Sequence, residues 1–193
     1  MVIFMETETR IHQFQLDPNS EPISQELTFD RVFKPDMLVQ IHAILSPEFS
    51  SRGGNIRDIP LSGLTDLTSG PGEVWAAFQN CIPVACLTIT PLEGSTGIWW
   101  YLNHGVIIPG LRYQGGQIME NLVRTCISTP RKDTRYVVIT VAPGHILRAG
   151  FSEIDPLTLS ETDPDLAYIV TQKLRPDKPA HVCVAFFHTG GCL

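Results

Sequence analysis

Apolar and polar residues alternate along much of the chain, and this alternation predicts strands. A period of two is typical of a strand with one buried face, and a short apolar run between turns is typical of a strand buried on both faces. Residues 80–83, which contain asparagine and proline, are expected to form a hairpin turn. Strands are expected at residues 11–16, 27–33, 73–80, 84–91, 96–108, 136–142 and 181–188.

Helical spacing of apolar residues separates several of these strands. Pro35 and Asp36 form a suitable helix start, and Pro47 is expected to end that helix. Residues 46–72 are expected to be mostly loop, with room for a short helix. Asp163 or Asp165 is expected to cap the last helix. Helices are expected at residues 37–45, 118–127, 143–149 and 166–174.

The longest expected strand, residues 96–108, carries three consecutive aromatic residues, Trp99, Trp100 and Tyr101. Because successive side chains of a strand point to opposite faces, both faces of this strand must be covered or must border a cleft. Gly105 lies inside the strand, where a glycine often marks a β-bulge or the close approach of another molecule. The alternative is a glycine packed beneath a large neighbouring side chain.

Residues 105–123 have the form of a strand, a glycine-containing turn and a helix. The strand runs into Pro109, which cannot donate to a ladder, and residues 110–117 are expected to form the turn. Backbone N–H groups at a helix N-terminus favour anions, and the adjacent Gly115 and Gly116 let a phosphate approach the main chain. The stretch lacks the lysine of a P-loop and the three-glycine dinucleotide fingerprint. It predicts an anion site built from backbone.

This stretch resembles motif A of the GNAT superfamily, the acyl-CoA-dependent N-acyltransferases. In that motif a strand ending in Val-x-Pro precedes a Tyr-Arg-Gly-x-Gly-x-Gly-like loop and an amphipathic helix. The chain differs by two additional residues before the tyrosine, and by Gln117 and Met119 at later glycine positions. The order of elements resembles the family over roughly residues 26–187, including the Gly150-Phe151 pair. The matching residues of motif A are Ile107-Ile108-Pro109, Tyr113-Gln114-Gly115, Ile118, Leu122 and Val123.

The resemblance implies a fold and an acyl donor. The fold would be α/β of the α+β type, with a GNAT-like mixed, mostly antiparallel central sheet flanked by helices. A single acyltransferase domain would occupy residues 26–193, after an N-terminal extension over residues 1–25. Acetyl-CoA would be the donor, an amine on a small molecule or a peptide N-terminus would be the acceptor, and no metal is implied. The expected acetyl-CoA-binding residues are Val106, Ile107, Ile108, Tyr113, Gln114, Gly115, Gly116, Gln117, Ile118 and Met119.

The catalytic positions depart from the family. Acyl transfer must remove a proton from an amine whose pKa is near about 10. The family often places a carboxylate on the central strand and a tyrosine in the helix before Gly-Phe. Here the first stretch offers Asn103 and His104, the tyrosine position holds Ile146, and His145 is adjacent. Strand alternation predicts that Asn103 and His104 point to opposite faces. The candidate catalytic residues are therefore His104, Asn103 and His145.

Two functions remain open on the sequence. In an active N-acyltransferase, His104 would face the cleft and act as a base. In a catalytically degenerate acyl-CoA-binding or interaction module, His104 would be a hydrogen-bonded core residue. The retained Tyr113-Gln114-Gly115-Gly116 favours the first function, and the absent tyrosine favours the second. Residues 152–179 exceed the minimal family core and are expected to line the acceptor pocket or to make a homodimer contact.

Composition narrows the range of partners. The chain has 193 residues, of which 43% are hydrophobic, and this suits one α/β domain. A net charge of −6 without a basic run argues against nucleic acid. Five cysteines form an odd number without metal-ligand spacing and fit a reducing compartment. The apolar start is too short for a signal peptide, and no run reaches membrane-spanning length, so a cytoplasmic location without a membrane partner is expected.

Overall fold

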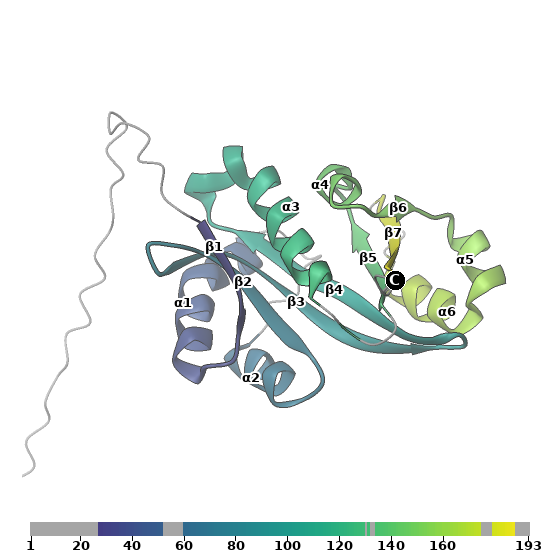
Figure 1. The fold of residues 1–193 in the computed structure, drawn as a ribbon, viewed down its shortest axis with the longest axis horizontal. Helices are drawn as coiled ribbons and strands as arrows, with labels where there is room; N and C mark the ends of the chain where they lie inside the picture. Colours follow the sequence, from purple (N-terminus) through teal and green to yellow (C-terminus); the bar gives the residue numbers. More distant parts are fainter. Residues whose placement is uncertain (1–26, 52–59, 130, 132–133, 175–178, 188–193) are drawn as a thin grey trace, which may run out of the picture.

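The computed structural model describes residues 27–51, 60–129, 131, 134–174 and 179–187, which form a twisted sheet flanked by helices (Figure 1). The expected extension over residues 1–25, with its strand, lies outside them. The strands are β1 (Leu27–Val32), β2 (Glu73–Gln79), β3 (Ile82–Gly94), β4 (Gly97–Ile107), β5 (Thr134–Thr140), β6 (Ser152–Glu153) and β7 (His181–Phe187). The helices are α1 (Pro35–Ser51), α2 (Leu61–Ser69), α3 (Arg112–Ser128), α4 (Gly144–Arg148), α5 (Pro156–Thr162) and α6 (Pro164–Lys173).

The seven strands form one sheet in the order β1-β2-β3-β4-β5-β7-β6. All neighbouring strands are antiparallel except β4 and β5, which are parallel. The long hairpin of β3 and β4 is the centre of this sheet. The expected fold class, a mixed and mostly antiparallel sheet flanked by helices, is confirmed.

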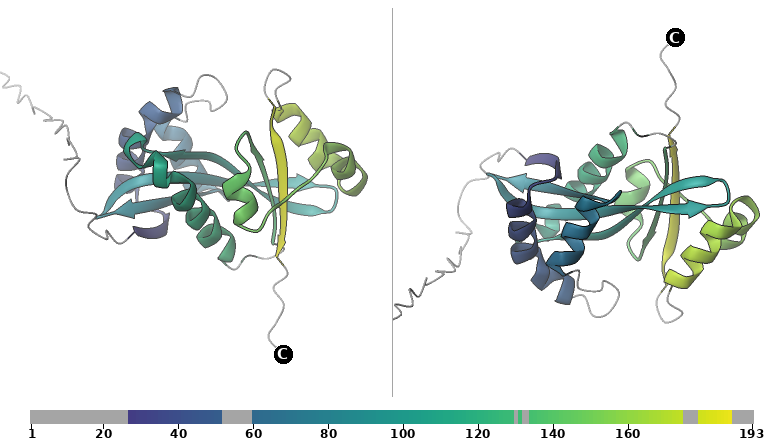
Figure 2. Two further views of the ribbon diagram at one scale, coloured as in Figure 1. Left: turned by 90° about the horizontal axis from the view of Figure 1, so that it is seen from above. Right: turned by 90° about the horizontal axis from the view of Figure 1, so that it is seen from below.

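Helices cover both faces of the sheet, and three apolar clusters lie beneath them (Figure 2). On one face, α3 and α4 pack over a cluster that includes Leu122 and Ile146. On the opposite face, α1 and α2 cover a second cluster through Ile41 and Leu64, and α5 and α6 cover a third through residues such as Leu166. We call the face under α1, α2, α5 and α6 the second face. It therefore has two separate apolar patches.

Local sequence signals account for several element ends. Asn80 and Cys81 have φ angles of 51° and 64°, and Gln79 pairs with Ile82, so the β2–β3 connection is a two-residue type I′ turn. Gly150 has a φ of 103° after α4. The N–H of Phe151 donates to the carbonyl of Ile146, and that of Gly150 donates to the carbonyl of Leu147. This is a Schellman motif, which explains the Gly-Phe pair seen in the sequence.

Two expected helix boundaries are wrong. Pro47 does not end α1, which continues to Ser51. Proline removes only one hydrogen bond, and its fixed φ is itself helical, so a helix can pass through it. The second error concerns residues 112–117, which were expected to be a turn but form the first turns of α3, directly after a short 3₁₀ turn at Pro109–Leu111. Glycine lowers helix propensity without forbidding a helix.

Asp163 joins the β3–β4 hairpin to α6. Its buried carboxylate accepts hydrogen bonds from the N–H of Leu166 at 3.0 Å, which caps α6, and from the indole of Trp99 at 2.8 Å. At the hairpin tip it accepts from the N–H of Ser95 and from the N–H and hydroxyl of Thr96. Burial alone would raise the pKa of Asp163, but these donors hold it far below its usual value. The carboxylate is fully used in holding the hairpin.

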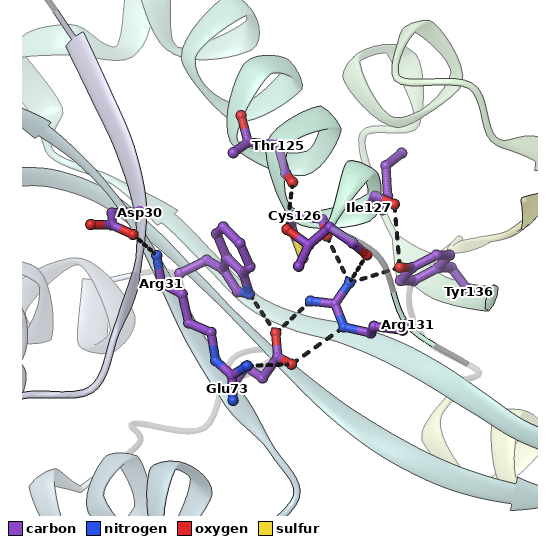
Figure 3. Close-up of polar contacts among 10 residues, drawn as sticks. Asp30, Arg31, Glu73, Thr125, Cys126, Ile127, Arg131 and Tyr136 are labelled. Carbon is purple, nitrogen blue, oxygen red and sulfur yellow. Dashed lines mark hydrogen bonds and ion pairs between the residues drawn. The ribbon is translucent and has the colours of Figure 1, made fainter. Parts of the chain in front are cut away.

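A second buried charge joins β2 to the segment between α3 and β5 (Figure 3). The Glu73 carboxylate lies 2.5 Å from the Arg131 guanidinium, 2.7 Å from the Trp75 indole nitrogen and 3.2 Å from Arg31. Arg131 also donates to the Tyr136 hydroxyl at 2.8 Å. Burial opposes the ionised form of Glu73, but the hydrogen bonds from Arg131 and Trp75 hold its pKa below the usual value. Because its donors and acceptors are paired, this cluster is structural.

Candidate functional site

The pairing of β4 with β5 stops part-way along both strands. Register partners run from Trp100 with Tyr136 to Leu102 with Val138. Beyond them β4 continues to Ile107 and β5 to Thr140 without further pairing between the two. The edge of β4 that faces β5 therefore presents backbone groups with no strand partner there. Unpaired backbone groups of this kind can bind an extended ligand.

A β-bulge interrupts β4 at this same point. Cys86 pairs with Val106, whereas Thr88 pairs with Asn103, so two residues of β4 lie opposite the single residue between them on β3. His104, one of the two, has a φ of 49° and is in the left-handed region. The bulge expected at Gly105 is confirmed, but the strained backbone belongs to the histidine. A Cβ on Gly105 would lie 3.5 Å from Met119, an ordinary contact, so packing does not require the glycine.

The bulge changes the direction of the His104 side chain. Its Nδ1 lies 2.9 Å from the hydroxyl of Thr88, and its Nε2 lies 3.5 Å from the amide nitrogen of Asn103. Alternation from Cys86 places Thr88 on the second face. The expectation that Asn103 and His104 point to opposite faces is therefore wrong, because the left-handed residue breaks the two-residue period. Both side chains lie together.

One arrangement of hydrogen bonds satisfies the contacts between Thr88 and His104. The buried Thr88 hydroxyl also lies 3.2 Å from the carbonyl of Asn103. If Thr88 donates its single proton to that carbonyl, its oxygen accepts from Nδ1–H of His104, and both contacts are satisfied. Nε2 then carries the lone pair. Burial, followed by the charge of Lys173, lowers the pKa of His104, so the imidazole is neutral near pH 7.

The side chain of Lys173 lies beside this group. Lys173 ends α6, and its Nζ is 5.1 Å from the centroid of the Tyr101 ring on β4. Tyr101 pairs with Thr90 on β3, and Thr90 lines a hollow between β3 and α2. The second face therefore carries polar groups between its two apolar patches. The hollow is lined by Gly63, Asp66, Leu67, Pro71, Gly72, Thr90 and Pro91.

The N-terminus of α3 follows directly after β4 and its 3₁₀ turn. Leu111, at the N-cap, provides no side-chain cap, so helix geometry leaves the first N–H groups without helical partners. The Arg148 guanidinium of α4 is next to this turn, because a Cβ on Gly116 would lie 3.5 Å from its Nη2. Arg148 is exposed, and its Nε donates to Glu120 at 2.7 Å. The Arg148 guanidinium and N–H groups that lack partners within the helix thus meet at the start of α3.

The expected donor-site residues divide into buried and accessible positions. Val106, Ile107, Ile118 and Met119 have buried side chains, so only their backbones can meet a ligand. Ile108 is half-buried, whereas Gly116 and Gln117 are exposed. Tyr113, Gln114 and Gly115 lie in the first turn of α3, and the side chains of Tyr113 and Gln114 are outside the described part of the structure.

His145 lies apart from the other two catalytic candidates. It is on α4, where burial and then the charge of Arg148 lower its pKa, while Glu120 opposes them. It therefore lies among α3 and α4, on the face opposite the second face, and apart from the group around His104. Ile146, at the family's tyrosine position, is buried in the core.

Sequence reasoning missed Thr88, Lys173 and Arg148. Each becomes relevant only through a contact with a distant segment, such as the 16-residue separation of Thr88 and His104. Within the described ranges, no group of three or more His, Cys, Asp or Glu residues could hold a metal ion, and no helix is long and apolar enough to cross a membrane.

Comparison with solved structures identifies the fold. The structure is similar to aminoglycoside 6′-acetyltransferase type Ii, with a TM-score of 0.55 and 13% identity over 82% of this chain and 96% of the other. A GNAT family acetyltransferase from Brucella melitensis in complex with acetyl-CoA gives 0.54 and 14% identity over 66% and 84%. FeeM, an N-acyl amino acid synthase from uncultured soil microbes, gives 0.52 and 13% identity over 84% and 91%.

The chain has the GNAT fold. At these identities the similarity establishes the fold alone. No protein-family model matches the sequence, and no curated protein matches it. The neighbours include both an aminoglycoside 6′-acetyltransferase and an N-acyl amino acid synthase, so a shared GNAT fold does not determine the acceptor.

Proposed function

We propose that this protein is an acetyl-CoA-dependent N-acyltransferase with His104 as its general base. The bulge in β4 is the observation that carries the proposal. It places the neutral imidazole of His104 beside Asn103, at the point where β4 and β5 cease to pair. A small amine or a peptide N-terminus is the acceptor, and the acyltransferase domain occupies residues 26–193.

The donor is proposed to bind along β4 and at the start of α3. Backbone groups of β4 beyond Leu102 would pair with the pantetheine arm of acetyl-CoA. The N–H groups of residues 113–116 and the Arg148 guanidinium would hold its phosphates, since helix N-termini and arginine both favour phosphate. The expected residues Val106, Ile107, Ile108, Gln117, Ile118 and Met119 complete this path, with the buried ones contributing backbone only.

The proposed reaction forms a C–N bond and breaks a C–S bond. The neutral acceptor amine attacks the thioester carbonyl, and its nitrogen becomes acidic as it gains positive charge. Nε2 of His104, directly or through one water, takes that proton, so a base with a lowered pKa is sufficient. The thiolate leaves readily, because a thiol has a pKa of about 8.5. Positioning and backbone donors of β4 supply the remaining acceleration.

The alternative is a degenerate GNAT-fold module that binds acyl-CoA, or another partner, without turnover. The observation that favours it is Ile146, whose buried side chain occupies the position of the family's tyrosine. An amine panel incubated with acetyl-CoA and analysed by mass spectrometry separates the two functions. Acetylated product supports the enzyme, and its absence despite acetyl-CoA binding supports the module.

Thermal unfolding tests the donor site directly. Saturating acetyl-CoA is expected to raise the melting temperature of the wild-type protein by mass action. Gly116→Glu should remove this shift, because the new carboxylate would occupy the phosphate position beside Arg148. Gly116→Ala is the matched control, since its Cβ has room, and it should keep the shift. An unchanged melting temperature for wild-type protein with saturating acetyl-CoA would contradict the donor assignment.

A further inference from the structure

We propose that Lys173 binds a carboxylate of the acceptor, so that the preferred acceptors are amines that also carry a carboxylate, such as amino acids. This inference rests on the proposed N-acyltransferase function and specifies its acceptor. It makes Lys173 a specificity-determining residue contributed by α6, the helix that the minimal family core does not require.

The position of Lys173 is defined by contacts with β4. Its ammonium lies over the Tyr101 ring, with 5.1 Å between Nζ and the ring centroid, a distance at which a cation and an aromatic face attract each other. Tyr101 precedes Asn103 by two residues and shares its face, because alternation holds up to the bulge. Lys173 is also close enough to His104 for its charge to act on the imidazole. The exposed ammonium therefore lies over Tyr101, on the face of β4 that carries the proposed base.

The charge of Lys173 has no acidic partner within the described part of the chain. The ion pairs there join other residues, and the nearby carboxylates of α6 are used elsewhere. Asp163 binds the hairpin and Asp165 accepts from the Ser95 hydroxyl. The chain is acidic, with 14 Lys and Arg against 20 Asp and Glu. An ammonium with no carboxylate of the described chain beside it therefore favours a carboxylate supplied by a ligand.

A hollow on the second face lies across the β3–β4 pairing from Tyr101, the residue that Lys173 contacts. The hollow lined by Thr90 is adjacent to Tyr101, because these two residues pair across the β3–β4 hairpin. Its lining contains one carboxylate, that of Asp66 on α2, and no basic side chain. Lys173 is not among the lining residues, so an acceptor is proposed to extend from the hollow past Tyr101 and to place its carboxylate at the Lys173 ammonium. The same positive charge disfavours the protonated amine and so assists its reaction.

A matched pair of acceptors tests the proposal. L-Leucine and leucinol share the amine and the side chain, and differ in a carboxylate against a neutral hydroxymethyl group. Lys173→Met should raise the KM for L-leucine about tenfold or more, which is the size of one lost charge-assisted hydrogen bond, and change that for leucinol by less than about twofold. Lys173→Arg should retain most of the affinity for L-leucine. Lys34→Met, which removes a lysine just before α1, should change neither value. Equal losses for both acceptors in Lys173→Met would overturn the proposal.

A binding measurement separates this inference from the proposed catalysis. The ¹³C resonance of the Lys173 ε-methylene, assigned with Lys173→Arg, can be followed by NMR in the CoA-bound full chain. It should shift on titration with L-leucine and not with leucinol. A shift without any acetylation would sustain the carboxylate site and refute the enzyme. Acetylation of amines without a shift would sustain the enzyme and refute the carboxylate site.

Discussion

Strand β4 carries a polar cluster at each end of its second face, and the two clusters differ in burial and in backbone geometry. At the hairpin end, Asp163 is 1% exposed and receives donors from the turn, from Trp99 and from α6. At the bulge end, His104 is partly buried, has a left-handed backbone, and has a pKa lowered by burial and by Lys173. The first cluster is built for stability. The second places a titratable group in a strained position next to an unpaired strand edge, as functional sites often do.

The largest expected effect is at the hairpin end. Asp163→Asn should destabilise the protein by about 3 kcal/mol, because the new amide NH₂ would face N–H donors that need an acceptor. Chemical denaturation measures this loss. Asp165→Asn is the matched control on the same helix turn, and it should cost less than about 1 kcal/mol because its hydrogen bond with Ser95 is exposed.

The pH dependence of stability gives a second test of Asp163. Its pKa in the folded state is below that of the unfolded chain, so its contribution is present above the unfolded-state pKa and is lost as the pH falls towards the folded-state value. Asp163→Asn should therefore flatten the acid limb of the stability curve. A variant with wild-type stability and an unchanged acid limb would show that the two clusters do not differ as described.

The next effect is at the bulge end and concerns rate. His104→Ala should lower kcat roughly a hundredfold while changing the melting temperature little, because general base catalysis is typically of this size. The rate of the wild-type enzyme should rise with pH through a pKa below 6.5, since the base acts when neutral and its pKa is lowered. That limb should be absent from the variant.

Two other histidines serve as comparisons for His104→Ala. His145→Ala should retain the acidic limb, because His145 lies with Arg148 and Glu120 on the other face. His181→Ala removes a histidine of β7 that contacts Glu153 of β6, and it should also retain the acidic limb. A folded His104→Ala variant with an unaltered pH–rate profile would remove His104 from the mechanism and leave proton transfer to water.

The smallest expected effect comes from the residue that orients His104. Thr88→Val keeps the buried shape but removes the hydroxyl that contacts Nδ1, so kcat should fall by less than about tenfold, with a loss of stability of about 1 kcal/mol. Thr88→Ser retains the hydroxyl and should restore most of the rate. If the valine and serine variants lose rate equally, the hydroxyl does not orient the imidazole.

The sequence predicts the sheet much better than it predicts the site. The alternation in β1, the aromatic run of β4 and the Gly150-Phe151 pair depend on neighbours in sequence, and each predicted its element. The start of α3 was misplaced, because glycines permit both a turn and a helix. The directions of Asn103 and His104 were wrong, since a left-handed residue within a strand leaves no periodic signal.

The residues that surround the site could not be found from local patterns. Thr88 and Lys173 reach His104 from β3 and α6, and Arg148 reaches Gly116 from α4. Asp163 was expected as one of two helix caps, but its bonds to the hairpin join residues 64 to 68 positions apart. Such pairs are determined by the topology of the sheet. They became visible only once β3, β4 and α6 were placed side by side.

The release of free CoA thiol tests the central claim most directly. Purified full-length protein is incubated with acetyl-CoA and a panel of amines, and thiol is followed over time for wild type and His104→Ala. Thiol release is expected to require the amine and to match the acetylated product mole for mole. It should fall about a hundredfold in the variant. Acetyl-CoA binding without amine-dependent thiol release in the wild-type protein would contradict the central claim, and would identify the chain as a binding module with the fold of an acetyltransferase.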